Sequence, residues 1–506
     1  MRWTALVGSA FATLGAAQEP AVSYVQFPER SIHDVVVADA DGNGGDDLIV
    51  SLRAGDDDGR EIVWCLRREG TPALRAPADR RLPLPRDVVA FVMADVDPSP
   101  GTELVLLSPS RVVAVVWPAD AERPSYRSIG SFDLLWQPPS PRYAFAFQEG
   151  VADLDGDGLD DLVLPQVGGF GVFVQRRGGD SDAATFVQSG LVLPAAVATD
   201  RQRNLARFEA QRGSGEIRFG DSGQPSFLVE VTHEVGAPRL VDWNADGRRD
   251  VAVLVGSRLV VFEQEEGGHY DADPSAVIEL PERGTPLFDP SSFADCVDLD
   301  GDGRAEFVRA SGRTEEDEVR SVLEVHRGQG GARLADEADE RLLLQGFVSA
   351  PRFADVDGDG VQDVVIGSLR TDLVDALAGG GSKAFDAQIN VFLGRGGDDA
   401  LRFRRPVALV HRVEVPTDGL RAADRALIEF VSDFDGDGIR DLFVRLGDGV
   451  LRVLPVTRRG RGLTVGDPVW TLASQPEARV SVRRSARGTV LLLEEKDQVV
   501  VVEGFR

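Results

Sequence analysis

The sequence has very little lysine and cysteine, and no long apolar segment beyond its first residues. Among 506 residues there are only two cysteines, Cys65 and Cys296, and only two lysines, Lys383 and Lys496. Two cysteines so far apart cannot form the disulfide framework of a small scaffold, so we expect buried free thiols. No internal run approaches the roughly 18 apolar residues of a membrane-spanning helix. The fold must therefore be held by its core and by features other than disulfides.

Positively charged residues are outnumbered by acidic ones. Lysine and arginine total 55 against 83 aspartate and glutamate residues, which gives a net charge of −28. No basic stripe stands against this field, so nucleic acid is not an expected partner. Hydrophobic residues make up 42% and charged residues 27%, an ordinary globular balance. The excess of acid therefore needs a local cause.

The first residues are typical of a secretory signal. Arg2 supplies a positive start, Trp3 to Leu14 is an apolar run, and Gly15-Ala16-Ala17 forms a small-residue cleavage site. We predict a signal peptide at 1–17 and one mature domain at 18–506. No cysteine lies near the cleavage point, so no lipid anchor is expected. The predicted location is secreted or periplasmic.

The remaining sequence shows no helical pattern of ordinary length. Short β-branched runs bounded by glycine or charge recur, as at 47–51, 162–165, 251–255 and 364–367. Only Leu420–Ala426 fits a short helical turn. The chain is therefore predicted to be all-β.

One acidic pattern recurs between these runs: Asp-x-Asp-x-Asp-Gly-x-x-Asp, with an apolar strand on either side. Asn43 and Asn244 replace one acid each in the first and fourth copies, and Glu306 takes the ninth position of the fifth. The second copy keeps acids only at positions one, three and nine. We number the copies loops 1 to 7; they start at Asp39, Asp95, Asp153, Asp242, Asp298, Asp355 and Asp433.

The spacing of the loops indicates the architecture. Successive starts are separated by 56, 58, 89, 56, 57 and 78 residues. About 56 residues fits four short strands with their turns, which is one blade of a β-propeller. The two longer gaps are expected to carry insertions near 195–224 and 372–383, on one face.

The C-terminal part contains one more repeat without acids. On the same frame, Val482–Val490 takes the loop position, followed by strands at Leu491–Glu494 and Gln498–Glu503. The missing fourth strand can come from Ala21–Phe27, which would close the ring and leave no exposed sheet edge. We therefore predict eight four-stranded blades closed by an N-terminal strand, with seven blades as the alternative.

The loops have the chemistry of a calcium site. Calcium takes six to eight oxygen ligands at roughly 2.3–2.6 Å. Carboxylates at positions one, three, five and nine and a backbone carbonyl at position seven can converge, while glycine at positions four and six permits the bends. An EF-hand would need a glutamate at position twelve and flanking helices, and position twelve here falls within β runs. Magnesium is disfavoured because it keeps its waters in strict octahedral geometry.

We therefore expect up to seven Ca²⁺ ions, and leave open whether loop 2, which departs from the pattern, takes one. The predicted ligand positions are Asp39, Asp41, Asn43, Gly45, Asp47, Asp95, Asp97, Ser99, Gly101, Glu103, Asp153, Asp155, Asp157, Leu159, Asp161, Asp242, Asn244, Asp246, Arg248, Asp250, Asp298, Asp300, Asp302, Arg304, Glu306, Asp355, Asp357, Asp359, Val361, Asp363, Asp433, Asp435, Asp437, Ile439 and Asp441.

The loop with its following strand, as at 355–368, resembles the FG-GAP / VCBS repeat family, the integrin α-subunit type of β-propeller. The segment Ile389-Asn-Val-Phe-Leu-Gly-Arg-Gly-Gly is similar to that family's next strand and glycine-rich turn. The resemblance covers essentially the whole mature chain. It implies a propeller with calcium in the blade loops and, commonly, an extracellular adhesion or ligand-binding role.

No catalytic constellation is evident in the sequence. The five histidines, His33, His233, His269, His326 and His411, lack metal-ligand spacing. No nucleophile elbow or phosphate loop occurs, and the aspartates are already assigned as ligands. Aromatic residues near Trp136 and Tyr143 fit either strand packing or a sugar-stacking shelf.

Two functions of different class remain. The first is a non-enzymatic binding or adhesion module for a protein or glycan, which the sequence favours because no acid, base or nucleophile is left over. The alternative is an extracellular polysaccharide-active enzyme, a lyase or hydrolase, with its site in the central channel. The sequence indicates neither the ligand nor the oligomeric state.

Overall fold

A computed structural model describes most of the chain between residues 20 and 505. The predicted signal peptide, both predicted insertions, Leu420–Ala426, Trp136, Tyr143 and His233 lie outside the described residues. The described ranges are 20–28, 30–54, 59–68, 74, 78–118, 121–131, 146–147, 150–166, 168–177, 184–193, 238–255, 258–280, 293–315, 318–327, 337–348, 351–369, 384–396, 402–416, 427–446, 448–485 and 488–505.

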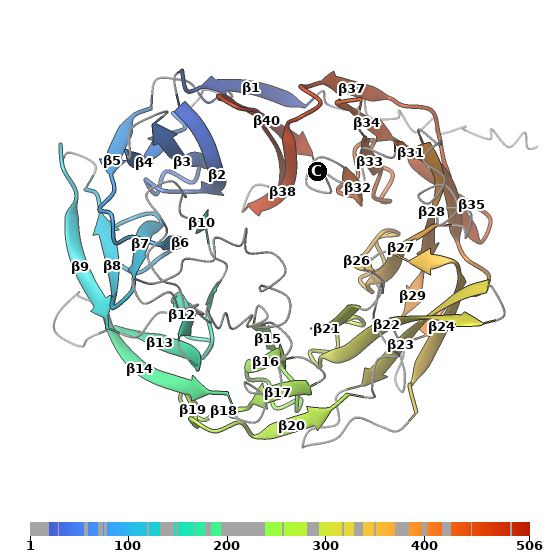
Figure 1. The fold of residues 1–506 in the computed structure, drawn as a ribbon, viewed down its shortest axis with the longest axis horizontal. Helices are drawn as coiled ribbons and strands as arrows, with labels where there is room; N and C mark the ends of the chain where they lie inside the picture. Colours follow the sequence, from blue (N-terminus) through green and yellow to red (C-terminus); the bar gives the residue numbers. More distant parts are fainter. Residues whose placement is uncertain are drawn as a thin grey trace, which may run out of the picture.

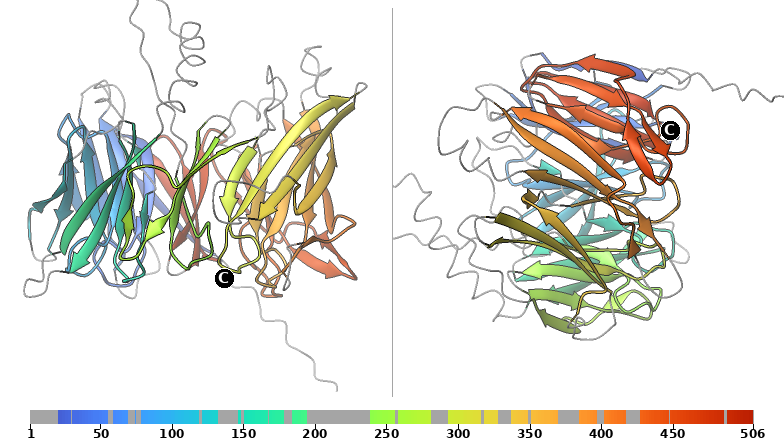
Figure 2. Two further views of the ribbon diagram at one scale, coloured as in Figure 1. Left: turned by 90° about the horizontal axis from the view of Figure 1, so that it is seen from below. Right: turned by 90° about the vertical axis from the view of Figure 1, so that its right-hand side faces the viewer.

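Eight antiparallel sheets stand around a central axis as the blades of a propeller (Figure 1). The first strand of each repeat lies on the axial side of its blade and the last strand lies at the rim, and Figure 2 shows the ring from the side. In blade 2 a short additional strand, β10 (Ala146–Phe147), lies inside the first strand. The described residues contain strands and no helix, and so none that is long and apolar enough to cross a membrane. The prediction of an all-β propeller with eight blades is confirmed, and the seven-blade alternative is wrong.

The blades follow one another in chain order. Blade 1 contains β2 (Arg30–Ala38), β3 (Asp47–Ala54), β4 (Arg60–Cys65) and β5 (Arg80–Pro83); blade 2 contains β6 (Ala90–Ala94), β7 (Glu103–Ser108), β8 (Arg111–Val116) and β9 (Ser125–Gly130), with β10 (Ala146–Phe147) parallel to β6; blade 3 contains β11 (Val151–Ala152), β12 (Asp161–Gln166), β13 (Gly169–Arg177) and β14 (Ala184–Val192); blade 4 contains β15 (Arg239–Val241), β16 (Asp250–Val255), β17 (Arg258–Phe262) and β20 (Ala276–Glu279).

The second half of the ring repeats this order. Blade 5 contains β21 (Phe293–Val297), β22 (Glu306–Glu315), β23 (Glu318–Arg327) and β24 (Glu340–Gln345); blade 6 contains β25 (Phe347–Val348), β26 (Arg352–Ala354), β27 (Asp363–Leu369), β28 (Ala384–Phe392) and β31 (Leu409–Pro416); blade 7 contains β32 (Leu427–Phe430), β33 (Leu442–Arg445), β34 (Val450–Leu454) and β37 (Trp470–Ala473); blade 8 contains β38 (Arg479–Ser485), β39 (Gly488–Glu494), β40 (Gln498–Phe505) and β1 (Ala21–Gln26).

Three small hairpins interrupt the connections between third and fourth strands. They are β18 (Gln264–Glu265) with β19 (His269–Tyr270) in blade 4, β29 (Gly394–Arg395) with β30 (Arg402–Phe403) in blade 6, and β35 (Val456–Arg459) with β36 (Gly462–Val465) in blade 7.

The ring is closed by strand β1, as predicted. β1 pairs antiparallel with β40 from Ala21 opposite Glu503 to Gln26 opposite Gln498. Blade 8 is therefore made from both ends of the described chain, and β1 covers the edge of β40 as the rim strand of the blade.

The prediction that Val482–Val490 occupies a loop position is wrong. Arg483 pairs with Val490 and Ser485 with Gly488, so the ladder between β38 and β39 runs almost to its turn. Without acids to fold around an ion, this segment continues the two strands instead of leaving them. The later strands of the repeat are confirmed, although β39 begins earlier than Leu491.

The hydrophobic core is divided into eight clusters, one at each junction between neighbouring blades. In β39, Leu491 and Leu493 pack toward blade 7, whereas Val490 and Leu492 pack toward blade 1. Because side chains alternate along a strand and both faces of the inner strands are covered, strands such as β6 and β7 are buried along their whole length, whereas the rim strand β9 is partly exposed. Cys65 and Cys296 are buried free thiols within this packing, as predicted.

Strand direction divides the connections between two faces of the ring. Antiparallel strands alternate in direction, so the connections from first to second and from third to fourth strand lie on one face. The other connections lie on the opposite face. All seven acidic loops join a first to a second strand and therefore share one face, which we call the loop face.

Candidate metal sites

The ninth-position acid of each loop is a buried residue at the start of the second strand. Asp47, Asp161, Asp250, Asp363 and Asp441 are 0% exposed, Glu306 is 1% and Glu103 is 7%. These side chains close the base of the loops beneath the more exposed acids of positions one to five. Acids are placed in such positions only where groups that compensate their charge are close by.

Backbone amides provide part of that compensation. Asp161 accepts the Leu154 N–H at 2.8 Å on Oδ2 and the Gln175 N–H at 2.7 Å on Oδ1. The ninth acids of loops 1, 4, 6 and 7 make the same two types of bond, one to their own loop and one beyond the third strand. In these five loops the ninth acid thus ties its loop to the body of the blade.

Burial nevertheless raises the pKa of these acids. The pKa is raised to about 6 for Asp161, Asp250 and Asp441. It is raised to about 7 for Asp47 and Asp363, and to about 8 for Glu103 and Glu306, where neighbouring loop carboxylates add to burial. A bound cation would offset both causes and hold these acids ionised.

The upper part of each loop is shaped by the first acid and by positive backbone φ angles. In loop 3 the Asp153 carboxylate accepts the N–H groups of Gly156, Asp157 and Gly158. Gly156 and Gly158 have φ of 78° and 83°, as the requirement for glycine at positions four and six predicts. Loop 4 has Ala245 at position four with φ of 61°, a conformation unfavourable for alanine.

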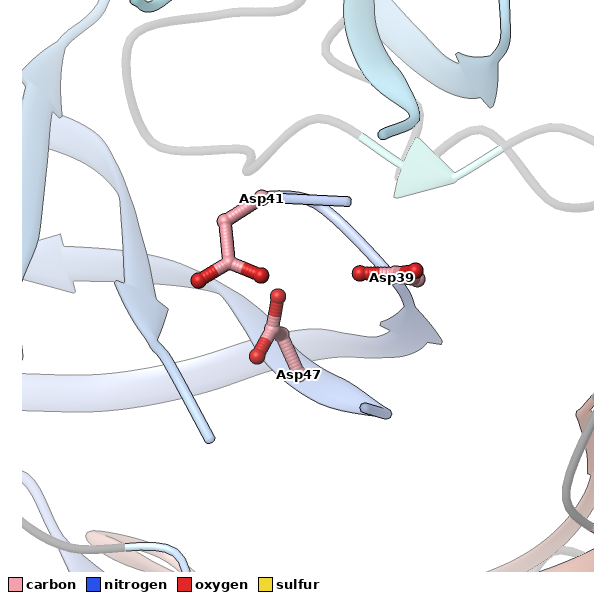
Figure 3. Close-up of side chains that lie close together, drawn as sticks. All are labelled: Asp39, Asp41 and Asp47. Atoms are coloured by element: carbon pink, nitrogen blue, oxygen red, sulfur yellow. The ribbon is translucent and has the colours of Figure 1, made fainter. Parts of the chain in front are cut away.

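Five of the seven loops bring three carboxylates together. In each, one oxygen from every acid lies within 4.8 Å of the others. Figure 3 shows this convergence for Asp39, Asp41 and Asp47 in loop 1. Loops 3 and 7 use the same positions one, three and nine, whereas loops 5 and 6 use positions one, three and five. The described acids of loops 2 and 4 form no such group.

Loops 2 and 4 have other partners for their acids. In loop 2 the Asp97 carboxylate accepts the Ser99 hydroxyl at 2.5 Å and pairs with Arg127 at 3.0 Å. In loop 4 Arg248, at position seven, donates to Asp246. The role of the seventh-position carbonyls as ligands stays a prediction; the N–H groups of these residues donate to the fifth position in loops 1 and 3 to 7.

Three buried carboxylate oxygens in these loops fit a bound cation. Asp39 Oδ1, Glu306 Oε1 and Asp357 Oδ1 have no hydrogen-bond partner among the described residues. A buried anionic oxygen without a donor is unfavourable, and a divalent cation supplies what is missing. A set made only of carboxylate and carbonyl oxygens suits calcium or another hard cation. The residues of loops 1, 5 and 6 therefore fit such an ion.

Arginines beside the acids were not anticipated from the sequence. Arg176 pairs with Asp155 in loop 3, and Arg327 lies 3.0 Å from both Asp300 and Asp302 in loop 5. Both arginines lie at the ends of third strands. Because the third strand pairs antiparallel with the second, counting residues across this pair from the ninth acid could have found them.

Neighbouring loops are also bonded to each other around the loop face. The backbone N–H at position eight donates to the preceding loop at junctions 1–2, 4–5, 5–6 and 6–7, from Thr102, Ala305, Gln362 and Arg440 at 2.7–2.8 Å. Junction 2–3 uses the Asp160 carboxylate, which accepts the Asp95 N–H, and junction 3–4 uses Gln264, which donates to the Leu154 carbonyl. Blade 8, which has no acidic loop, is outside this chain of contacts.

Comparison with known families gives one match. Residues 298–366, which contain loops 5 and 6, match the family described as FG-GAP-like repeat. The chain carries an FG-GAP-like repeat. The resemblance found in the sequence is thus confirmed, and the other acidic loops take the same place in their blades as the two loops of the matched FG-GAP-like segment. None of the curated proteins compared with this chain matches it.

Solved structures resemble this chain only distantly. A lectin of Agrocybe aegerita that recognises non-reducing terminal N-acetylglucosamine is 14% identical, with a TM-score of 0.41 over 94% of this chain and 99% of that chain. Sqt1 of Chaetomium thermophilum is 13% identical, with a TM-score of 0.43 over 96% and 98%. The rhamnogalacturonan lyase of Bacillus licheniformis is 14% identical, with a TM-score of 0.33 over 96% and 74%. These likenesses indicate no function for the chain with the FG-GAP-like repeat.

Proposed function

We propose that the chain is a secreted, calcium-binding propeller that serves as a non-enzymatic binding or adhesion module for a protein or glycan. Calcium in the acidic loops would brace the blades on the loop face. The observation that carries the proposal is the division of labour between the faces: the acidic loops and the bonds between them occupy one face, which leaves the opposite face for a ligand.

The outer part of blade 2 has a feature suited to a ligand. A cavity of about 350 Å³ is lined by Tyr126, 58% exposed, and Ser128 of β9, together with residues of β7, β8 and the connection from blade 1. Asp87 and Arg111 form an ion pair at 3.2 Å on the same lining. An aromatic ring with adjacent hydroxyl and charged groups is suited to a saccharide or a polar peptide side chain.

The calcium part of the proposal is tested by counting ions. Native mass spectrometry of the purified chain in calcium should show bound Ca²⁺, and Asp433→Asn in loop 7 should remove one ion. The matched change Asp97→Asn in loop 2, where Arg127 and Ser99 already satisfy the carboxylate, should leave the count unchanged. A wild-type protein that binds no calcium would contradict the proposal.

The binding part is tested by a glycan array and by a pull-down from the native exterior milieu, both in calcium. Tyr126→Ala should weaken capture, whereas Tyr24→Ala, an exposed tyrosine on β1, serves as the control. A parallel screen against uronate-containing polysaccharides addresses the enzymatic alternative. Turnover by the purified protein that is lost on replacing a residue of the innermost strands, such as Arg352, would overturn the binding-only proposal.

A further inference from the structure

The hairpin β35–β36 of blade 7 lies against the acidic loop of blade 6. Leu463 in β36 donates its N–H to the Ala408 carbonyl of blade 6 at 2.8 Å, and its side chain joins the core cluster shared by both blades. At the base of the hairpin, the Val456 N–H bonds the ninth acid of loop 7, Asp441, at 2.7 Å. The hairpin is therefore anchored to loop 7 at one end and to blade 6 at the other.

From this position the hairpin reaches a predicted ligand of loop 6. Arg458 Nη2 donates to Asp357 Oδ2 at 2.8 Å. The Asp357 side chain is 1% exposed, and its other oxygen, Oδ1, is buried without a hydrogen-bond partner. Asp357 is one of the three acids, with Asp355 and Asp359, whose oxygens converge in loop 6. One oxygen of Asp357 is thus occupied by the neighbouring blade, and the other is left for an ion.

We propose that Arg458 is a positioning residue for the metal site of loop 6, so that the site in blade 6 is completed by blade 7 and an ion bound there joins the two blades. The inference rests on the proposed calcium binding. Hydrogen bonds to the outer oxygen of a ligand fix its rotamer and orient the inner oxygen, and their loss typically weakens metal binding about 10- to 100-fold.

The contact pattern separates this role from competition with the ion. In loop 5 the Arg327 guanidinium lies within 4.0 Å of three acids, Asp300, Asp302 and Glu306. Among the acids of loop 6, Arg458 contacts only Asp357, and only at Oδ2. A positioning group leaves one oxygen of its carboxylate free, and Arg458 leaves Asp357 Oδ1 without a hydrogen-bond partner.

The chain offers a matched control on the same strand. Arg459 is the next residue of β35; it is exposed, its backbone pairs with Gly462, and its side chain has no ion-pair partner among the described residues. Side chains alternate along a strand, so Arg458 and Arg459 point in opposite directions. Arg458→Gln and Arg459→Gln therefore remove the same charge from the same hairpin, and only the first removes the contact with Asp357.

The test measures bound Ca²⁺ across a calcium concentration series by native mass spectrometry of the full chain. Asp357→Asn identifies the step that belongs to loop 6. We expect Arg458→Gln to move that step to about 10-fold or more higher calcium, Arg459→Gln to leave it in place, and Arg458→Lys to restore part of it, since an ammonium group can still bond Oδ2. A simple loss of packing would not be rescued in this way.

Hydrogen exchange supplies the second readout. Calcium should slow amide exchange in Val456–Val465 of the wild type and of Arg459→Gln, and have less effect in Arg458→Gln. If the wild type binds no calcium, the proposed function fails. If the wild type binds calcium and Arg458→Gln binds it equally well, the positioning role is wrong, and tighter binding by Arg458→Gln would show that Arg458 competes with the ion.

Discussion

The six junctions along the arc from blade 1 to blade 7 differ from the two junctions that blade 8 makes with its neighbours. At the former, neighbouring acidic loops are bonded to each other on the loop face in addition to the apolar packing between sheets. At the latter only one of the two blades has an acidic loop; β1 completes blade 8 by pairing with β40, and Arg67 of blade 1 forms an ion pair with Glu503 of blade 8 at 2.5 Å. The ring is thus held together by two different kinds of contact.

The difference indicates what the acidic loops are for. Blade 8 has the same four strands and the same two-sided apolar packing as its neighbours, so a blade needs no acidic loop to fold. The loops instead add contacts between blades, and they do so only along the arc where they occur. We therefore expect metal removal to loosen the arc of blades 1 to 7. It should leave the two junctions of blade 8, which we call the seam, almost unchanged.

Chelation is expected to have the largest effect. Ions bound only to the folded chain stabilise it by mass action, by about 2.7 kcal/mol for a site at 100 times its Kd. With five or more sites, EDTA should lower the Tm by about 10 °C or more. Hydrogen exchange should accelerate in the loops and stay slow in the β1–β40 ladder. A Tm that EDTA does not change would show that metal ions do not stabilise the arc of blades 1 to 7.

Gly358→Ala should be the most damaging single substitution among those compared. Gly358 has φ of 72°, and a Cβ there would lie 2.5 Å from the Gly438 carbonyl oxygen of loop 7. Left-handed backbone alone costs alanine roughly 1 kcal/mol, and the clash should raise the loss to about 3 kcal/mol.

The matched control is Gly156→Ala, at the same position of loop 3. Its φ is 78°, with no atom within 4 Å of the added Cβ. The difference between the two variants in chemical denaturation measures the contact between loops. Equal losses would mean that the contact between loops 6 and 7 contributes nothing.

The seam can be weakened separately through Val25. This residue of β1 is 0% exposed in the core cluster between blades 8 and 1. Val25→Ala should cost about 2 kcal/mol from lost burial and the cavity left behind. The loss should be the same in calcium and in EDTA, because no residue of this core cluster belongs to an acidic loop. Replacing its exposed neighbour Tyr24 with alanine should change the free energy of unfolding by less than about 0.5 kcal/mol. A loss for Val25→Ala that depends on calcium would show that the seam is not independent of the metal loops.

The remaining effect, similar in size to that of Val25→Ala, is a pH dependence at the seam. Burial raises the pKa of Glu494 in β39 to about 7, although Arg479 partly opposes this shift. The folded protein thus holds the proton more tightly than the unfolded chain does. The stabilisation that protonated Glu494 gives the folded state is complete below the ordinary pKa near 4.5 and is lost as pH rises through 7.

Between pH 5 and 8, wild type should therefore lose about 2 kcal/mol more stability than Glu494→Gln, measured by urea unfolding at each pH. Identical pH profiles for the two proteins would show that the environment of Glu494 does not favour its protonated form.

Local patterns in the sequence were sufficient for much of this structure. Each acidic loop spans nine residues, and the spacing between loops gives the blade period, so the number of blades and the closure by Ala21–Gln26 could be predicted. The buried position of the ninth acid also follows from its place before an apolar strand.

Features that depend on a neighbouring blade could not be predicted in this way. The contact of Arg458 with Asp357 joins residues 101 positions apart, and no pattern links them. The tight pairing of Val482–Val490 was missed because alignment on the loop frame assumes that a loop keeps its length after losing its acids. Strand pairing, which satisfies the backbone, decides that outcome instead.

The β1–β40 ladder also has a consequence for how the protein folds. Residues 21–26 meet residues 498–503, whereas the hydrogen bonds within an acidic loop join residues two to seven positions apart. Contacts between distant residues form late because the intervening chain must first be confined. Loops and hairpins can therefore form as the chain emerges, but the ring cannot shut until its last strand is available. Until then two sheet edges are open to pairing with other chains, and this interval is when the molecule is most prone to aggregate.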